Sequence, residues 1–280
     1  MFWKSTYNEF IKIAAKPRSY IGIGAITIII GIILFAMKAE GMNFISFVTG
    51  PFEQALSFEG NILNGNLIAF IILQTLIIHV PLLIALVTGD LVSGEGAMGT
   101  IRLLLTKPIS RTNILFSKFM AGCAYTLVIL LWMALLAFVV SKWLFGSGDL
   151  MVLNSDGLIV LQEQDLPWRF FCGFSVAYLS LIMIATLSLT LSCFSENSIG
   201  PIVTTMAIII LFTIIGSLNV PALEAVQPYL FTSHMAAWRS FFEDPLPADK
   251  ILHSAGVLLA HIVILLAVAV YKFNRKDILS

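Results

Sequence analysis

Residues 198–217 read SIGPIVTTMAIIILFTIIGS, a stretch of 20 residues without a charged side chain. A charged side chain at the centre of a membrane helix costs about 2.5–3.5 kcal/mol on insertion scales, so charge-free runs mark membrane spans. At a rise of 1.5 Å per residue, about 20 residues cross the ~30 Å hydrocarbon core of a bilayer. Because backbone groups in that core must bond within the segment, we expect a helix here.

Five further runs of this kind surround that stretch in the sequence. Together they predict six transmembrane helices, at about residues 19–37, 67–89, 119–141, 170–193, 198–217 and 252–271. The predicted fold class is all-α, a polytopic membrane protein. No internal repeat is apparent, so we expect residues 19–272 to form one six-helix domain, preceded by a segment 1–18 and followed by a tail 273–280.

The composition of the chain agrees with residence in a membrane. Of its 280 residues, 59% are hydrophobic and only 11% are charged, whereas soluble domains carry about 25% charged residues. The net charge is zero, which gives no sign of a nucleic-acid partner. The three cysteines, Cys123, Cys172 and Cys193, lie in or beside apolar runs without a CxxC pair, which favours small buried hydrophobes over a disulfide or a metal site.

The distribution of lysine and arginine predicts the orientation of the spans. If both termini are cytoplasmic, the outer segments hold only five of the 16 basic residues: Lys38, Lys142, Arg169, Arg239 and Lys250. The positive-inside rule therefore favours an even number of spans with both ends in the cytoplasm. The three outer segments are each about 30 residues long, enough for short helices or caps, and the proline- and aromatic-rich segment 219–250 is expected to form a cap before the last span.

The first 18 residues, MFWKSTYNEFIKIAAKPR, predict an amphipathic helix that lies in the inner membrane interface. Its apolar side chains can share one broad face: Phe2, Trp3, Phe10, Ile11 and Ile13. Lys4, Lys12 and Lys16 can then reach lipid headgroups. The alternative is a frayed basic tail that only sets the topology.

The inner segment 90–118, DLVSGEGAMGTIRLLLTKPISRTNILFSK, carries most of the inner-loop charge. Its Gly94, Gly96 and Gly99 match a dinucleotide-binding fingerprint, but that motif requires a preceding strand and a membrane helix precedes it here. No GxxxxGK[ST] motif exists to hold ATP phosphates. We expect a short amphipathic helix over 100–106, a break at Pro108 and a second helix capped by Ser110. Such a hairpin could dock a cytosolic partner, or it could be an ordinary positive-inside loop.

The run EGAMGTIRLLLTKPISRTNILFSK, residues 95–118, resembles the inner-loop pattern of ABC-2-type transporter permeases. That pattern is roughly E-x3-G-T-[IL]-x2-L-L-[ST]-x-P-[IV]-[ST]-R-x2-[IL]-x3-K. The matching positions are Glu95, Gly99, Thr100, Leu104, Leu105, Pro108, Ser110, Arg111 and Lys118. The closing FNRKDI, residues 273–278, is similar to the usual end of these permeases, whereas the EAA-type inner loop of importer permeases fits poorly.

This resemblance implies a membrane subunit that does not itself hydrolyse ATP and holds no cofactor. Two copies of a cytosolic ABC ATPase would carry ATP and Mg, and a second copy of this chain or a related permease would complete the transporter. The resemblance favours an exporter in a bacterial inner membrane. The ATPase would contact a coupling helix in the 95–118 region. The implied coupling residues are Glu95, Gly99, Thr100, Arg102, Pro108, Ser110, Arg111 and Lys118. The transported substrate does not follow from the resemblance.

Gln74, His79 and His261 lie inside predicted spans, where polar side chains often mark transport pathways. Gln74 and His79 precede Pro81 in the second span, and His261 lies midway along the sixth. They could line a pathway, or they could form hydrogen bonds between helices, which contribute roughly 0.6 kcal/mol on average. With these residues the chain could also be an ATP-independent scaffold or a secondary carrier, although carriers commonly show internal repeats.

Overall fold

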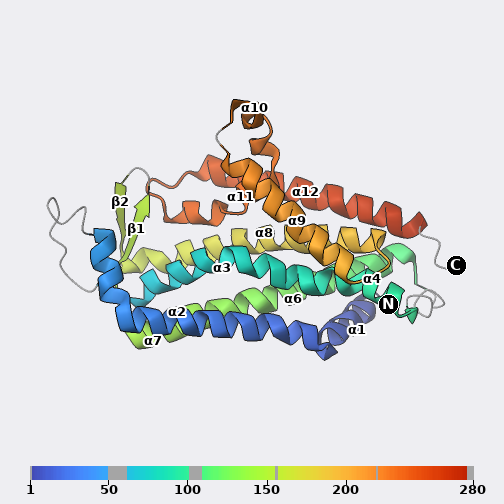
Figure 1. Cartoon of the computed structure of the whole chain (residues 1–280), viewed down its shortest axis with the longest axis horizontal. Coiled ribbons are helices and arrows are strands. Elements are labelled where there is room, and N and C mark those ends of the chain that lie inside the picture. The colour runs from blue at the N-terminus through green and yellow to red at the C-terminus, as the bar shows by residue number, and fades with distance from the viewer. Residues whose placement is uncertain (1, 50–61, 101–108, 155–156, 219, 276–280) are drawn as a thin grey trace.

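The protein is an all-α polytopic membrane protein (Figure 1). The computed structural model describes residues 2–49, 62–100, 109–154, 157–218 and 220–275. Within this part of the chain, six helices are long and apolar enough to cross a membrane. The second of them runs along α3 and α4, and the third continues from α6 into α7.

The secondary structure begins with the N-terminal helix α1 (Phe2–Ala15) and the long helix α2 (Pro17–Thr49). It continues with α3 (Gly65–Thr88), α4 (Asp90–Ala97), α6 (Arg111–Leu135), the π-helical turn η2 (Leu136–Val140), α7 (Ser141–Phe145), β1 (Leu150–Asn154) and β2 (Gly157–Leu161). The last part comprises η3 (Glu163–Asp165), α8 (Leu166–Phe194), α9 (Ile199–Ser217), α10 (Pro221–Glu224), η4 (Gln227–Tyr229), α11 (Phe231–His234), η5 (Ala237–Phe242) and α12 (Ala248–Arg275).

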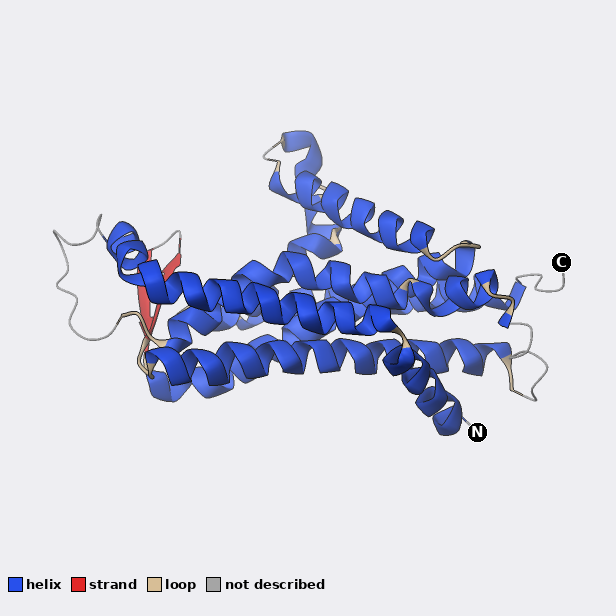
Figure 2. Cartoon of the chain, turned by 60° about the horizontal axis from the view of Figure 1, so that its bottom comes forward, coloured by secondary structure: helices blue, strands red, loops and turns tan. Residues whose placement is uncertain are grey.

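The long helices form an elongated bundle with two different ends (Figures 1 and 2). One end holds α1, α4, the beginning of α6 and the end of α12, so both chain termini lie there. The other end holds the end of α2, α7 and the β1–β2 hairpin. The segments predicted to be inner and those predicted to be outer are therefore separated along the long axis of the bundle.

The helices extend beyond several of the predicted spans. The third was predicted to begin at residue 119, but α6 begins at Arg111, because Ser110 caps it by accepting a hydrogen bond from the backbone N–H of Asn113 at 3.3 Å. The second continues past residue 89 as α4, with a turn at Gly89. The final helix α12 includes the first three residues of the predicted tail, and Phe273 is completely buried.

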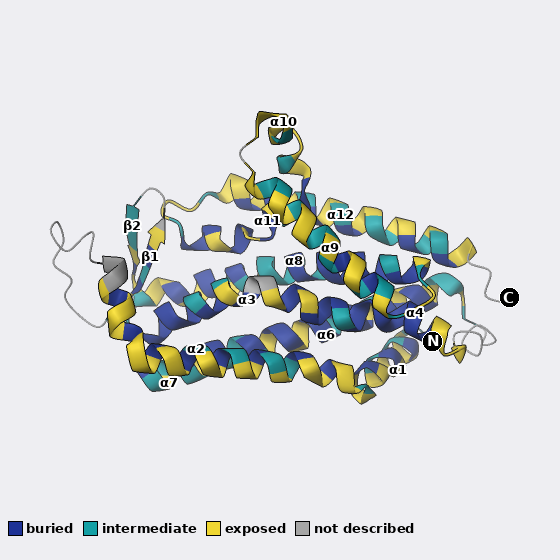
Figure 3. Ribbon diagram, in the orientation of Figure 1, coloured by how far each residue is buried: buried dark blue, intermediate teal, exposed yellow. Residues whose placement is uncertain are grey.

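The centre of the bundle is formed mainly by α3 and α8, whereas α2, α9 and α12 keep much of their surface on the outside (Figure 3). Edge-to-face aromatic contacts connect these central helices to η5. Phe242 of η5 lies 5.0 Å from Phe70 of α3 and 4.8 Å from Phe170 of α8, measured between ring centroids. Arg169 donates to the backbone oxygens of Phe241 and Glu243 at 2.8 and 3.1 Å. Part of segment 219–250 thus packs into the bundle as a cap.

The segment between α7 and α8 contains an antiparallel hairpin that the sequence analysis did not predict. Strands β1 and β2 pair from Leu150 opposite Leu161 to Asn154 opposite Gly157. The connection before the hairpin is fixed to the start of α3, since Gly65 donates to the carbonyl of Gly146 at 2.8 Å. The backbones approach so closely there that a Cβ on Gly65 would lie 2.6 Å from Cα of Lys142.

Candidate functional site

A cluster of buried charges joins α1, α4 and α6 at the end of the bundle that holds both termini. We call Glu9, Lys12, Glu95 and Lys118 the ion-pair cluster. The Lys118 ammonium lies 2.8 Å from Oε2 of Glu9 and 2.7 Å from Oε2 of Glu95. The Lys12 ammonium lies 2.5 Å from Oε1 of Glu9 and 2.8 Å from Oε1 of Glu95. Each carboxylate is therefore held between two ammonium groups.

The charged side chains of this cluster are buried to different degrees, and two of them are almost completely inaccessible to solvent. The Lys118 side chain is 0% exposed and the Glu9 side chain 3% exposed, whereas Lys12 is 43% exposed. Removing charges from water is costly unless they are paired and hydrogen-bonded. The 2:2 balance of charges meets that requirement, so the N-terminal helix α1 is fixed to α4 and α6.

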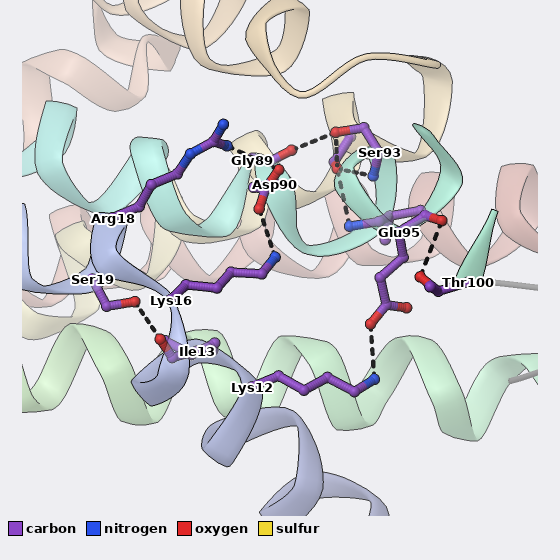
Figure 4. Close-up of polar contacts among 12 residues, drawn as sticks. Lys12, Ile13, Lys16, Arg18, Ser19, Gly89, Asp90, Ser93, Glu95 and Thr100 are labelled. Carbon is purple, nitrogen blue, oxygen red and sulfur yellow. Dashed lines mark hydrogen bonds and ion pairs between the residues drawn. The ribbon is translucent and has the colours of Figure 1, made fainter. Parts of the chain in front are cut away.

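A second group of ion pairs lies beside the cluster, at the first residue of α4 (Figure 4). Asp90 forms two ion pairs. Nζ of Lys16 lies 2.6 Å from its Oδ2, and Nη1 of Arg18 lies 3.1 Å from its Oδ1. Gly94 makes room for this carboxylate, because a Cβ at Gly94 would lie 2.2 Å from Oδ1 of Asp90. Both cations come from the junction of α1 and α2, where Ser19 donates to the carbonyl of Ile13 at 2.5 Å.

The start of α4 is held in place by α8. The first turn of a helix leaves backbone N–H groups without intrahelical partners. The Ser192 hydroxyl of α8 accepts hydrogen bonds from the N–H groups of Val92 and Ser93 at 3.2 and 2.8 Å. At Gly89 a Cβ would lie 2.8 Å from the Ser188 hydroxyl. Close packing against α8 therefore sets the position from which Asp90 and Glu95 point toward α1.

Lys12 is one member of the cluster whose protonation responds to this environment. Partial burial disfavours its charged form, but the hydrogen bonds and charges of Glu9 and Glu95 outweigh burial and hold the pKa of Lys12 above its ordinary value. The ammonium therefore stays charged throughout the physiological pH range. No group of three or more potential metal ligands occurs among the residues that the structure describes.

The structure divides the predicted coupling residues into two sets. Glu95 and Lys118 are buried in the ion-pair cluster and are not available on the surface for a partner. Gly99 is exposed and has φ +69°, the left-handed conformation with which glycine commonly ends a helix. Thr100, also exposed, donates to the carbonyl of Glu95 at 3.3 Å.

The second part of the motif begins at the cap of α6. Ser110 provides the cap, and the guanidinium of Arg111 donates to the carbonyl of Asn274 at 3.0 Å, which joins the start of α6 to the end of α12. Arg102, Pro108 and all but the first residue of the short helix predicted over 100–106 lie outside the described residues. The coupling-helix prediction is therefore neither supported nor opposed by the structure.

The predicted pathway residues lie apart from the ion-pair cluster. His79 and His261 each use a ring nitrogen to bond the backbone carbonyl one turn earlier in their own helix, at Thr75 and Val257. Gln74 lines a crevice of about 320 Å³ between α2, α3 and the hairpin. In the described part of the chain, none of the hydrogen bonds places these three side chains around a common polar pathway.

Sequence reasoning did not single out Glu9 and Asp90, and it assigned Lys12 and Lys16 to lipid headgroups. The structure instead pairs both lysines with carboxylates, and it buries Ile13 against the bundle. The available signal was that the two acids of this segment, Asp90 and Glu95, directly follow the second span, with no basic residue before Arg102. Because a helical periodicity does not show which face meets another helix, that signal could not identify the partners.

A bundle of six long apolar helices fixed by ion pairs at one end defines the class, a polytopic α-helical membrane protein. The chain belongs to the family described as "Protein of unknown function (DUF2705)", whose model matches residues 24–279. It is also similar to the uncharacterized protein YhcI of Bacillus subtilis (strain 168), with 27% identity over 118 residues. That match covers 40% of this chain and 37% of the relative, so it extends over little more than a third of the relative's length.

Proposed function

We propose that this chain is the membrane-spanning permease subunit of an ABC transporter, in which a separate cytosolic ATPase supplies the energy for translocation. The observation that carries the proposal is the motif of residues 95–118, which resembles the inner loop of ABC-2-type permeases. The absence of a P-loop from the sequence assigns ATP and Mg to the partner. Export is the direction that the resemblance favours.

The geometry around the motif supports a mechanical role. The residues on either side of 101–108 connect to different parts of the bundle: Glu95 and Lys118 to α1 through the ion-pair cluster, and Arg111 to α12. A force applied to the segment between them would therefore act on α1, α4, α6 and α12 together. Buried ion pairs of good geometry resist separation, so the ends of α1, α4, α6 and α12 that meet here would move as a rigid unit.

The location of the chain follows from the same proposal. The described residues of the motif and both termini lie at one end of the bundle (Figure 1), and the distribution of basic residues favours the cytoplasm for that end. We place the chain in a bacterial cytoplasmic membrane, with two ATPase copies and a second permease, either this chain or a related one. The YhcI relative is bacterial, in agreement with this setting.

The proposal is tested by purifying the tagged chain from membranes of its own host. We expect a soluble protein with a P-loop to co-purify at about one copy per permease and the complex to hydrolyse ATP. Arg111→Ala should lower permease-dependent ATP hydrolysis while membrane insertion is retained. Lys250→Ala is the matched control, because its weak 3.4 Å pair with Glu243 lies away from the motif.

Two results would contradict the proposal. One is a wild-type chain that is folded, inserted and free of any P-loop protein, which would favour the ATP-independent scaffold or carrier. The other is an Arg111→Ala variant that supports full ATP-driven transport.

A further inference from the structure

A large groove lies between α6, η2 and α8, toward the end of the bundle opposite the ion-pair cluster. We call it the α6–α8 groove. Its volume is about 710 Å³, within the range of sites that hold small molecules. Most of its lining is aromatic or aliphatic, including Phe138 and Phe174. Leu131 and Phe171 at its rim are 58% and 74% exposed. Since both belong to membrane-spanning helices, the open side of the groove faces the acyl chains of the bilayer.

Four polar residues line the groove: Asn66, Lys142, Ser175 and Tyr178. The hydroxyls of Ser175 and Tyr178 donate to the backbone carbonyls of Phe171 and Cys123, which leaves Asn66 and Lys142 as the polar groups available to a ligand. The Asn66 side chain is 1% exposed, and its Nδ2 donates to the carbonyl of Gly148 at 2.7 Å. Its Oδ1 has no hydrogen-bond partner among the described residues. A buried acceptor left without a donor costs about 1–3 kcal/mol, so this atom indicates a missing hydrogen-bond donor.

Lys142 supplies a positive charge at the same place. Of the ion pairs in the described part of the chain, none involves its ammonium. The next residue, Trp143, is 82% exposed. Exposed tryptophans on membrane helices are enriched at the level of the lipid headgroups. The polar end of the groove is therefore at the depth where a phosphate would lie, and the apolar part extends from it along the acyl chains.

The helix that forms one wall of the groove is interrupted at this level. Residues 136–140 form a π-helical turn, and Phe138 and Val139 of that turn line the groove. π-turns within α-helices occur frequently at functional sites. The interruption changes the face that the following residues present, and Lys142 follows directly in α7.

We propose that the α6–α8 groove binds one anionic glycerophospholipid, of the phosphatidylglycerol type, from the surrounding bilayer. Its phosphate pairs with the Lys142 ammonium, a headgroup hydroxyl donates to Oδ1 of Asn66, and one acyl chain lies along Phe138 and Phe174. Charge complementarity selects an anionic lipid over phosphatidylcholine, which carries no net charge and no headgroup hydroxyl. The inference does not depend on the function proposed above.

Native mass spectrometry of the detergent-purified chain tests this inference, with phosphatidylglycerol or phosphatidylcholine added at equal concentration. We expect one retained phosphatidylglycerol per chain and at least fivefold less phosphatidylcholine. Lys142→Gln should abolish this preference by lowering phosphatidylglycerol retention about fivefold. Val139→Trp should lower retention of both lipids, because it fills the groove from a position that is 62% exposed and therefore tolerant of a larger side chain. Lys250→Gln is the matched control, a cation that does not line the groove.

Three results would overturn the inference. Equal retention of the two lipids by the wild type would show that the groove does not select lipids by their charge. Unchanged phosphatidylglycerol retention by a monodisperse Lys142→Gln or Val139→Trp variant would show that the lipid does not bind in the α6–α8 groove. An equal loss in Lys250→Gln would show that the lipid responds only to overall surface charge.

Discussion

Replacing Lys118 by methionine tests whether the ion-pair cluster holds this end of the bundle together. The substitution keeps the length and most of the volume of the side chain but removes the charge between Glu9 and Glu95. Both carboxylates then depend on Lys12 alone, whose side chain is 43% exposed. Removing one partner of a buried ion pair costs about 3–5 kcal/mol, because an uncompensated charge stays buried. We expect a loss of this size in the free energy of unfolding.

The assay is a thermal melt of the purified chain in a mild detergent, followed by the loss of the monodisperse peak. For a domain of about 150–250 residues, 1 kcal/mol corresponds to about 2–4 °C, so the melting temperature should fall by roughly 6–20 °C. Lys250→Met removes an exposed pair, worth about 0–1 kcal/mol, and should stay close to the wild type. Adding Glu95→Gln to Lys118→Met should restore part of the loss, because it removes one of the two stranded charges.

Two results would refute this reasoning. A Lys118→Met variant that melts within about 2 °C of the wild type would show that the cluster adds little to stability. A double variant less stable than Lys118→Met would show that Glu95 stabilises the bundle by some means other than its pair with Lys118.

Three further variants probe the same end of the bundle by melting temperature. Gly94→Ala should destabilise by about 1–3 kcal/mol, since its Cβ would displace Asp90, whereas Gly96→Ala, with open space around it, should not; equal effects would contradict the close approach. Ser110→Ala should cost about 1 kcal/mol through the lost cap of α6, and Ser110→Asp should recover it. The stability contributed by the Lys12 pairs is complete below its ordinary pKa of 10.5 and is lost as pH rises through the raised pKa of the folded state. The difference between wild type and Lys12→Met should therefore be constant from pH 7 to 9 and shrink above pH 10.5; a difference that shrinks already below pH 9 would contradict the raised pKa.

The six membrane helices could be predicted from the sequence because charge-free runs of about 20 residues have few alternatives in a bilayer. The cap of α6 could also be predicted, as the Ser110 hydroxyl acts on the next turn of its own helix. The hairpin was missed although two apolar four-residue segments, 150–153 and 158–161, flank Asn154–Gly157, a turn-forming sequence. Both segments are far shorter than a span, and their pairing competes with the short helices that the length of the outer segment also allows.

The ion-pair cluster could not be predicted in the same way. Its members come from α1, α4 and α6, and Glu9 lies 109 residues from Lys118 in the sequence. The motif that resembles ABC-2-type permeases contains Glu95 and Lys118. The pattern does not distinguish an exposed residue that contacts a partner from a buried residue that holds the segment on the bundle. Burial separates these roles: Glu95 and Lys118 are inside the bundle, and Gly99 and Thr100 are on its surface.

The π-helical turn of residues 136–140 also determines the direction in which the side chains of α7 point. Successive residues of an α-helix are about 100° apart around the axis. A π-turn closes its hydrogen bond over one more residue than an α-turn, so it accommodates one surplus residue. Deleting one residue would restore regular α-helix and leave Ser141–Phe145 on nearly the same faces, whereas converting the turn to α-helix at constant length would rotate them by roughly 100°. Without the π-turn, a chain of the same length would turn Lys142 away from the groove that it lines, so the direction of this side chain depends on how the turn accommodates one surplus residue.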